Sequence, residues 1–207
     1  RSFPKMVKRL CDLSITLFVI PLVSPLFLLI AIGIKLTSKG PVLFRQKRIG
    51  EAGRQFTFYK FRSMFENAES KTHRRWVKNF ISNGDGGPKG VQKIIGDPRV
   101  TKFGYFLRKS SLDELPQLIN VLRGEMSLVG PRPPIPYEAE LYKLWHKKRL
   151  STKPGMTGLW QVSGRSSVSF TQMVLLDIYY AENWSLGLDL EILLKTVPVV
   201  ISRRGAY

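Results

Sequence analysis

The sequence predicts an α/β protein, mostly helical, with a re-entrant membrane helix hairpin and a compact cytosolic domain. That domain is expected to hold a small antiparallel sheet and interfacial amphipathic helices. Residues 13–34 contain no charged side chain, and a helix of that length crosses about 30 Å of hydrocarbon. Val42 and Phe44, and then residues 55–61, show the apolar-polar alternation of strands, and apolar residues recur at helical spacing after residue 110. We expect residues 1–36 to form the membrane element and residues 37–207 the cytosolic domain.

Pro21 and Pro25 interrupt the apolar run. Each removes a backbone donor and clashes with the preceding turn, so we expect the helix to break at Ser24-Pro25. The Ser24 hydroxyl is suited to bond back to a carbonyl one turn earlier. Lys and Arg flank the run on both sides, and such residues stay mainly on the cytoplasmic side. We therefore predict a hairpin that enters one leaflet and returns, although hydropathy alone supports a kinked spanning helix nearly as well.

The charge balance predicts anionic partners. The chain has 33 Lys and Arg against 15 Asp and Glu, a formal net charge of +18. Because the apolar run favours a membrane, and the sequence has no zinc-finger, RNP or basic-zipper pattern, we expect membrane lipids and phosphorylated ligands rather than nucleic acid. A single cysteine, Cys11, excludes an intrachain disulfide framework. Since the sequence begins with Arg1 rather than Met, a fragment of a longer protein is one interpretation.

The cytosolic region divides into a β-hairpin and a series of helices. Residues 42–61 predict the hairpin, with Gly50 and Gly53 in its turn. Residues 82–89 form a loop by composition. Helices are expected at residues 64–80, 110–123, 137–149, 170–183 and 188–201, and residues 103–109 form an apolar and basic stretch. The helix at 137–149 would be amphipathic, with apolar residues on one face and basic residues on the other. It could lie on an anionic membrane surface or pack its apolar face on the domain core.

Asp113 and Glu114 are an acidic pair in a basic stretch. Pro116 is tolerated only in the first turn of a helix, so the helix is expected to begin close to Asp113. One interpretation is structural: Ser111 to Glu114 matches a capping box, or Asp113 is itself the cap. The other is chemical, because an ionised aspartate attacks phosphorus when a cation neutralises the approaching anion. Glu114 would help Asp113 to hold that cation, for which magnesium is suited.

Several motifs resemble one enzyme family, the bacterial sugar transferases of the monotopic polyprenyl-phosphate phosphoglycosyl transferase type. They are Lys8-Arg9-x-x-Asp12, the runs at 40–50 and 58–64, Ser-Leu-Asp-Glu-Leu-Pro-Gln-Leu within 97–133, and Lys-Pro-Gly-Met-Thr-Gly-Leu-Trp-Gln-Val-Ser-Gly-Arg at 153–165. The resemblance covers nearly the whole chain except residues 71–95. That segment looks like an insertion, interpreted as a cover over the site or a contact between the subunits of a homodimer.

The resemblance implies transfer of a hexose 1-phosphate from a UDP-sugar to undecaprenyl phosphate, with release of UMP. Galactose or glucose is favoured. The family's nucleophile falls on Asp113, which would form a covalent aspartyl-phosphosugar intermediate, and Glu114 matches the adjacent acid associated with Mg²⁺. The active site would lie on the cytoplasmic face of the bacterial inner membrane, at the first membrane step of exopolysaccharide or O-antigen synthesis.

Further residues receive expected roles from the same resemblance or from their charge. Arg108 and Arg132 match basic residues near the nucleotide and phosphates, and Ser24-Pro25 matches the break in the family's re-entrant helix. Lys60, in a basic strand, and Arg165, at the end of a glycine-rich loop, are candidate phosphate ligands. The alternatives are a non-catalytic basic scaffold that binds glycan or lipid, which leaves the acidic pair unexplained, and ordinary glycosyl transfer to a lipid.

Overall fold

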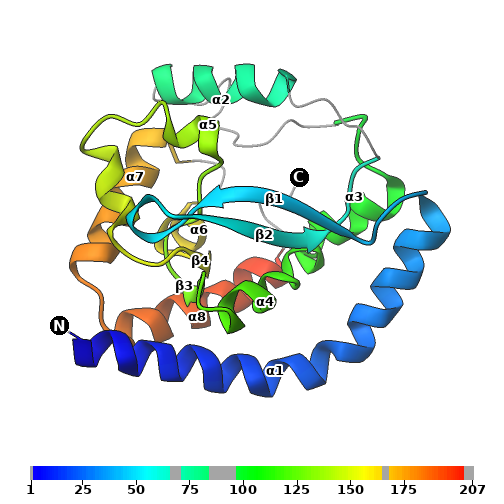
Figure 1. The fold of residues 1–207 in the computed structure, drawn as a ribbon, viewed down its shortest axis with the longest axis horizontal. Coiled ribbons are helices and arrows are strands. Elements are labelled where there is room, and N and C mark those ends of the chain that lie inside the picture. The colour runs from blue at the N-terminus through cyan, green and yellow to red at the C-terminus, as the bar shows by residue number, and fades with distance from the viewer. Residues whose placement is uncertain (1, 66–70, 84–96, 165–167, 203–207) are drawn as a thin grey trace.

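A computed structural model describes residues 2–65, 71–83, 97–164 and 168–202, and its centre is a β-hairpin surrounded by helices (Figure 1). The strands are β1 (Leu43–Ile49), β2 (Gln55–Phe61), β3 (Ser127–Val129) and β4 (Gly155–Thr157). The helices are α1 (Ser2–Thr37), α2 (Lys71–Asn83), α3 (Lys102–Lys109), α4 (Gln117–Leu122), α5 (Pro136–Ala139), α6 (Leu159–Ser163), α7 (Phe170–Glu182) and α8 (Leu186–Ile201). In Figure 1, α1 lies below the hairpin and α2 above it.

The predicted β-hairpin is confirmed. Strands β1 and β2 pair antiparallel, with Arg45 opposite Tyr59 and Arg48 opposite Phe56. The turn between them needs positive φ, which Gly53 adopts at 78° without steric cost. The structure adds a pairing that the sequence did not predict, because β3 and β4 are short and run parallel.

Helix α1 is a single bent helix. It contains both Pro21 and Pro25, and Figure 1 shows it changing direction about halfway along its length. As predicted, the Ser24 hydroxyl donates to the carbonyl of Pro21, at 2.9 Å. The predicted break is thus present as a bend within one helix, rather than as two antiparallel arms.

One side of α1 packs against the domain along its whole length. Val19 and Ile20 contact the core that contains Phe58 and Val121, while Ile34, further along, is buried beside Leu107. Gly33 permits a close approach in this second half, because a Cβ there would lie 2.6 Å from the Phe103 ring. The domain therefore fixes both arms of the bent helix.

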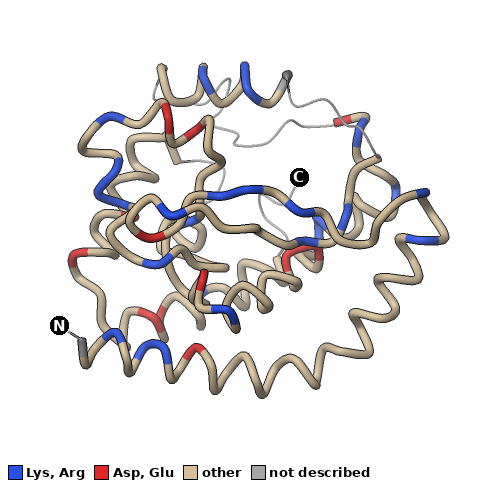
Figure 2. The backbone as a smooth tube through the Cα atoms, viewed as in Figure 1, with Lys and Arg blue, Asp and Glu red and all other residues tan. Residues whose placement is uncertain are grey.

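The other side of α1 is apolar and exposed. Its exposed side chains are Phe3, Met6, Leu10, Ile15, Leu17, Phe18, Leu22, Leu28, Leu29, Ile32 and Leu36. Figure 2 shows charged residues only towards the two ends of the helix. The helix is long and apolar enough to cross a membrane by length and composition. A continuous apolar surface of this kind marks contact with a partner or a membrane.

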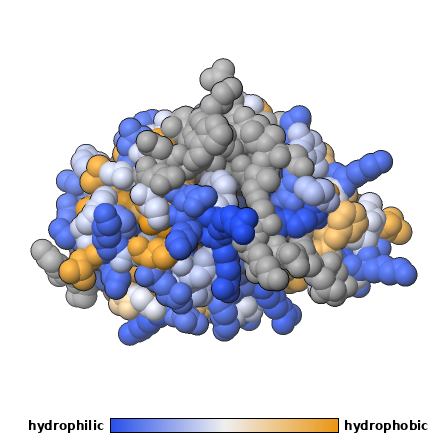
Figure 3. Space-filling view, turned by 90° about the horizontal axis from the view of Figure 1, so that it is seen from above, coloured by the Kyte–Doolittle hydropathy of each residue, from blue (hydrophilic) through white to orange (hydrophobic). Residues whose placement is uncertain are grey.

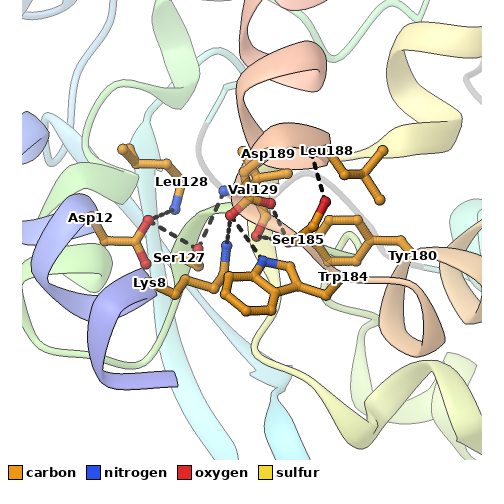
Figure 4. A network of polar contacts seen from close by, with 10 residues as sticks. All are labelled: Lys8, Asp12, Ser127, Leu128, Val129, Tyr180, Trp184, Ser185, Leu188 and Asp189. Atoms are coloured by element: carbon orange, nitrogen blue, oxygen red, sulfur yellow. Dashed lines mark hydrogen bonds and ion pairs between the residues drawn. The ribbon is translucent and has the colours of Figure 1, made fainter. Parts of the chain in front are cut away.

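Polar contacts anchor the start of α1 to the C-terminal half of the chain (Figure 4). The Asp12 carboxylate accepts hydrogen bonds from the Ser127 hydroxyl at 3.0 Å and from the Leu128 amide at 3.1 Å. The Lys8 ammonium lies 2.5 Å from the Asp189 carboxylate, which also accepts from the Tyr180 hydroxyl. These contacts explain the Lys8-Arg9-x-x-Asp12 motif as a clamp between α1 and the domain.

The predicted helix at 110–123 is shorter than expected. A 3₁₀ turn spans Leu112–Glu114, and α4 begins only at Gln117. Ser111 has a φ of 58° and makes no capping hydrogen bond, so the capping-box prediction is wrong. The prediction that the helix begins close to Asp113 is also wrong, since the α-helical ladder starts after Pro116, which lacks an amide hydrogen.

The predicted amphipathic helix at 137–149 is also wrong. Helix α5 ends at Ala139, and a separate 3₁₀ helix spans His146–Ser151. Arg149, expected on a basic surface, is buried and pairs with Asp177. His146, in the same predicted helix, is buried as well. A strong long-range partner for Arg149 overrides the local periodicity.

Helix α2 occupies the first half of the predicted insertion. The predicted helix at 64–80 begins later, at Lys71, and Met64 instead forms a β-bridge with Val100. Trp76 stacks on Phe80, with ring centroids 5.1 Å apart, and Phe80 belongs to a buried cluster with residues of α7. Residues 84–96, which include most of the predicted loop, lie outside the described residues. The predicted helices at 170–183 and 188–201 are confirmed as α7 and α8, and the apolar and basic stretch at 103–109 forms α3.

Candidate functional site

Asp113 lies in the 3₁₀ turn Leu112–Glu114, which packs against the end of β2. Its side chain is buried, with 7% of the residue exposed. Its charge acts on two cationic groups, Lys60 and Arg108, and stabilises the protonated form of each. A buried carboxylate normally costs free energy, and neighbouring cations reduce that cost. The turn therefore holds an acid inside a positive environment.

Lys60 is brought to the site by β2. Its ammonium lies over the Phe44 ring, 5.3 Å from the ring centroid. Burial lowers the pKa of Lys60 from 10.5 to about 8, the Asp113 carboxylate opposes the decrease, and Arg108 adds to it. Lys60 is thus a cation whose proton is easily lost, and an anionic ligand would stabilise its charge.

Arg108 is held at the end of α3. The Thr101 hydroxyl caps the start of this helix by accepting from the Gly104 amide at 2.8 Å. A Cβ on Gly104 would lie 2.0 Å from the carbonyl oxygen of Ser63, so only glycine fits there. The Arg108 Nε atom donates to the Ser63 hydroxyl at 2.9 Å. Helix α3 and the chain after β2 together hold this guanidinium near Leu112–Glu114, which we call the acidic turn.

Arg132 approaches the acidic turn from an extended, proline-rich segment. Its Nη1 atom lies 3.2 Å from Oε1 of Glu114, and both side chains are partly exposed. Prolines cannot donate backbone hydrogen bonds, so the carbonyls of this segment need donors from elsewhere. The donors are the Gly155 amide to Pro131, an Arg149 amino group to Arg132, an Arg48 amino group to Pro133 and the Ile49 amide to Pro134. Three separate parts of the chain, at residues 48–49, 149 and 155, therefore hold the segment around Arg132 in place.

A buried polar network lies behind this segment. Arg149 pairs with Asp177 and donates to the Tyr142 hydroxyl at 2.7 Å. The Tyr142 hydroxyl in turn donates to Glu138 at 2.6 Å. Burial raises the pKa of Asp177 to about 6, and the Arg149 charge acts against that increase. Rigid support of this kind is what a precisely oriented side chain such as Arg132 requires.

The acidic pair fits a magnesium ion. Within the described part of the chain, no three His, Cys, Asp or Glu side chains converge to form a metal site on their own. Magnesium does not require one, since it commonly uses one or two carboxylates together with substrate phosphates and water. Asp113 and Glu114 supply two neighbouring carboxylates beside three basic side chains that suit phosphate. The donor set therefore matches a metal held jointly with a phosphorylated substrate.

The structure brings most of the predicted site residues together around the acidic turn. They are Asp113, Glu114, Lys60, Arg108 and Arg132. Ser24 and Pro25 belong to the bend of α1. Arg165 lies outside the described residues. The face that carries α2 is rich in hydrophilic side chains (Figure 3), in contrast to the apolar outer side of α1.

Sequence reasoning missed the residues that position Arg132. Arg48 is buried beside the Phe58 ring and donates to Pro133 at 2.8 Å. Arg149 and Asp177 are 28 residues apart and form an ion pair that is almost fully buried. Arg48 lies opposite Phe56 across the hairpin. The sequence of β1 alone gives no signal of this burial, since the nearest residues on the same face are Gln46 and Gly50.

Comparison with known proteins identifies the family. A family model described as bacterial sugar transferase matches residues 3–203. The exopolysaccharide production protein ExoY of Rhizobium meliloti is 45% identical over 207 residues, covering 100% of this chain and 91% of that protein.

Two further relatives have more specific names. An undecaprenyl-phosphate galactose phosphotransferase of Salmonella typhimurium is 43% identical over 214 residues, covering 98% of this chain and 42% of the relative. A UDP-glucose:undecaprenyl-phosphate glucose-1-phosphate transferase of Caulobacter vibrioides is 41% identical over 208 residues, covering 97% of this chain and 72% of the relative. Because the family model spans almost the entire sequence, the chain belongs to the bacterial sugar transferase family.

Proposed function

We propose that this chain transfers a hexose 1-phosphate from a UDP-sugar to undecaprenyl phosphate, through a covalent intermediate on Asp113. The observation that carries the proposal is the buried Asp113 carboxylate, placed among Lys60 and Arg108 and next to Glu114. The names of the Salmonella and Caulobacter relatives support the substrate class and favour galactose or glucose. A non-catalytic scaffold would not need a buried acid in this environment.

In the first step, a carboxylate oxygen of Asp113 attacks the phosphorus that bears the sugar. A new oxygen–phosphorus bond forms, and the bond from that phosphorus to the bridging oxygen of UMP breaks, so UMP leaves with the electron pair. Lys60, Arg108 and Arg132 neutralise the phosphate oxygens during the attack, which lowers the repulsion between two anions. Magnesium, bound by the acidic pair, would supply further neutralisation of the diphosphate charge.

In the second step, a phosphate oxygen of undecaprenyl phosphate attacks the same phosphorus. The bond to Asp113 breaks, the aspartate is regenerated as a carboxylate, and the product is undecaprenyl-diphosphate-sugar. The covalent intermediate lets two bulky substrates use one site in turn.

The membrane placement follows from α1. We propose that its exposed apolar side enters one leaflet and that the bend at Ser24-Pro25 returns the chain to the cytoplasmic face. Basic residues at both ends favour this arrangement. A test is labelling of single cysteines at Lys5 and Lys39, in a Cys11→Ser background, with a membrane-impermeant reagent in sealed inverted vesicles. We expect both to be labelled, whereas labelling of only one would establish a crossing.

The enzymatic proposal is tested by the nucleotide that is released. Purified protein is incubated with magnesium, undecaprenyl phosphate and a panel of UDP-sugars, and we expect UMP to appear with one or both of UDP-galactose and UDP-glucose. Release of UDP would instead indicate ordinary glycosyl transfer. Asp113→Asn is expected to abolish turnover, while Glu182→Gln on the exposed end of α7 serves as the matched control. Normal turnover in Asp113→Asn would remove Asp113 from the nucleophile role.

A further inference from the structure

A cavity of about 740 Å³ opens beside the acidic turn, between the end of α1 and the β-hairpin. Its lining residues are Pro41, Val42, Leu43, Phe44, Arg45, Lys60, Arg62, Ser63, Met64, Phe65 and Arg108. The volume lies within the range of about 300–1,000 Å³ that is typical of small-molecule sites. Two of the lining residues, Lys60 and Arg108, are the cations on which the Asp113 charge acts. The cavity is therefore continuous with the candidate site.

The lining is divided between polar and apolar groups. Lys60, Arg108 and the Ser63 hydroxyl stand on the side of Asp113. Most of the other lining side chains are apolar, and the Phe44 and Phe65 residues keep 39% and 53% of their surface exposed. Phe44 and Phe65 lie outside the buried core clusters of the described residues. Exposed aromatic rings at the wall of a cavity indicate an apolar ligand rather than a stabilising core contact.

The apolar part of the cavity begins where the membrane helix ends. Arg62 donates from its two amino groups to the carbonyls of Lys39 and Ser38, at 2.6 and 2.8 Å. These bonds fasten the chain after α1 to the end of β2 and use both amino groups of Arg62. Of the basic residues that line the cavity, Lys60 and Arg108 are the two on which the Asp113 charge acts.

We propose that this cavity is the acceptor subsite, which holds the phosphate and the first isoprenoid units of a prenyl phosphate. The phosphate lies between Lys60 and Arg108, beside Asp113, and the prenyl chain runs along Phe44 and Phe65 towards the end of α1. This inference rests on the proposed function. Its occupant is the acceptor rather than the UDP-sugar, because the wall beyond Lys60 and Arg108 is mostly apolar and includes the aliphatic side chains of Val42, Leu43 and Met64. These side chains suit a prenyl chain but cannot hydrogen-bond the hydroxyls of the ribose and the sugar.

The subsite makes a prediction that separates the two half-reactions. Phe44→Ala and Phe65→Ala each remove an aromatic contact to the prenyl chain, and burial of such surface corresponds to about a tenfold effect in affinity. We expect KM for a prenyl phosphate acceptor to rise about tenfold. Stoichiometric UMP release in the absence of acceptor should change less than twofold in Phe65→Ala, whereas Phe44→Ala also removes the ring beneath the Lys60 ammonium, so its UMP release is expected to fall as well. Phe106→Ala, with 50% of the residue exposed and outside the cavity lining, is the matched control.

The outcomes distinguish a failure of the proposed function from a failure of the acceptor subsite. If no UMP is released in the acceptor-free reaction of the wild-type protein, the proposed function fails. If UMP is released normally but KM for the acceptor is unchanged in both phenylalanine variants, the subsite is overturned and the function stands. If both half-reactions fall equally in Phe44→Ala and Phe65→Ala, the cavity serves the donor or the fold, and the subsite is again overturned.

A binding measurement tests the same subsite without turnover. Farnesyl phosphate that carries a diazirine on its second isoprenoid unit is photo-crosslinked to the full chain in lipid nanodiscs, and the labelled peptides are mapped by mass spectrometry. We expect labelling at residues 42–45 and 64–65, and competition by unlabelled farnesyl phosphate. Competition by phosphatidylglycerol at the same concentration would identify a site for membrane lipid headgroups, and competition by inorganic phosphate alone a simple anion site. Either result would contradict the proposal.

Discussion

Arg132 and Glu114 form an ion pair at 3.2 Å across 18 residues of sequence. The contact joins the proline-rich segment to the acidic turn. With side chains 32% and 26% exposed, the pair is open to solvent screening, and its contribution to stability is small. Its value lies in orientation: each side chain fixes the direction of the other beside Asp113.

A double-mutant cycle tests this orientation. We expect Arg132→Met and Glu114→Gln each to lower kcat/KM for the UDP-sugar more than tenfold, because each releases the other side chain. The double variant is expected to be less impaired than the product of the two single effects, with a coupling energy of about 0.5–3 kcal/mol. Strictly multiplicative losses would show that the two residues act independently. Glu191→Gln, in the exposed pair with Lys195, is the control.

The buried pair of Arg149 and Asp177 should dominate the stability of the region behind the site. Asp177→Ala leaves the Arg149 charge buried without its ion-pair partner, and we expect a loss of about 3–5 kcal/mol in the free energy of unfolding. The double variant Arg149→Met with Asp177→Leu should recover most of that loss, since an apolar pair has no charge to desolvate. Thermal unfolding in detergent measures both. An Asp177→Ala variant as stable as the wild type would contradict the burial of this pair.

Lys60 should titrate near neutral pH. Because burial lowers its pKa from 10.5 to about 8, its amine is expected to lose its proton near pH 8, whereas an exposed lysine keeps it for more than two further pH units. The labelling rate of Lys60 by an amine-reactive reagent, followed in magnesium-free buffer, should therefore reach half its maximum at about pH 8. Adding a UDP-sugar should move that midpoint upward, because the phosphates stabilise the ammonium form. A midpoint near 10.5 without ligand would contradict the burial of Lys60.

The Asp12 contact can be followed at a single backbone amide. The Leu128 amide donates to the Asp12 carboxylate at 3.1 Å, and β3 pairs with β4 through Ser127 and Val129 instead. In Asp12→Ala this donor loses its acceptor, so we expect hydrogen exchange at Leu128 to accelerate strongly and stability to fall by about 1–3 kcal/mol. Asp12→Asn keeps an acceptor oxygen and should retain most of the protection. Equal exchange in all three proteins would exclude the contact.

The elements that the sequence predicted well are those with a strong local period. The alternation in residues 55–61 is enough to define β2, and the apolar spacing in residues 170–183 defines α7. The start of α4 could not be predicted from the sequence. Ser111 adopts a left-handed backbone conformation, and a serine in the sequence gives no signal of that conformation. Strands β3 and β4 have three residues each, too few for any period to appear.

In the candidate site, too, the sequence predicted only the residues that have a distinctive local pattern. Asp113 and Glu114 stand out because acids are rare in this basic chain, and the motif around them is distinctive. The supporting residues carry no such signal: Arg149 looked like one more cation on a basic surface, and only its distant partner Asp177 explains its burial. Long-range pairing of this kind is decided by tertiary packing, which a local pattern does not contain.

The ion pair between Lys8 and Asp189 also bears on the order of synthesis. The two residues are 181 positions apart, so the ribosome makes Lys8 long before Asp189. Helix α1 therefore emerges, and meets the lipid, long before the acid that secures its first turns exists. During that interval the domain residues that precede Asp189 can already contact one side of α1, and the membrane or a chaperone can cover the exposed apolar side. A chain that stops before residue 189 would therefore keep the contacts of Asp12 with Ser127 and Leu128 but lack the ion pair that holds Lys8.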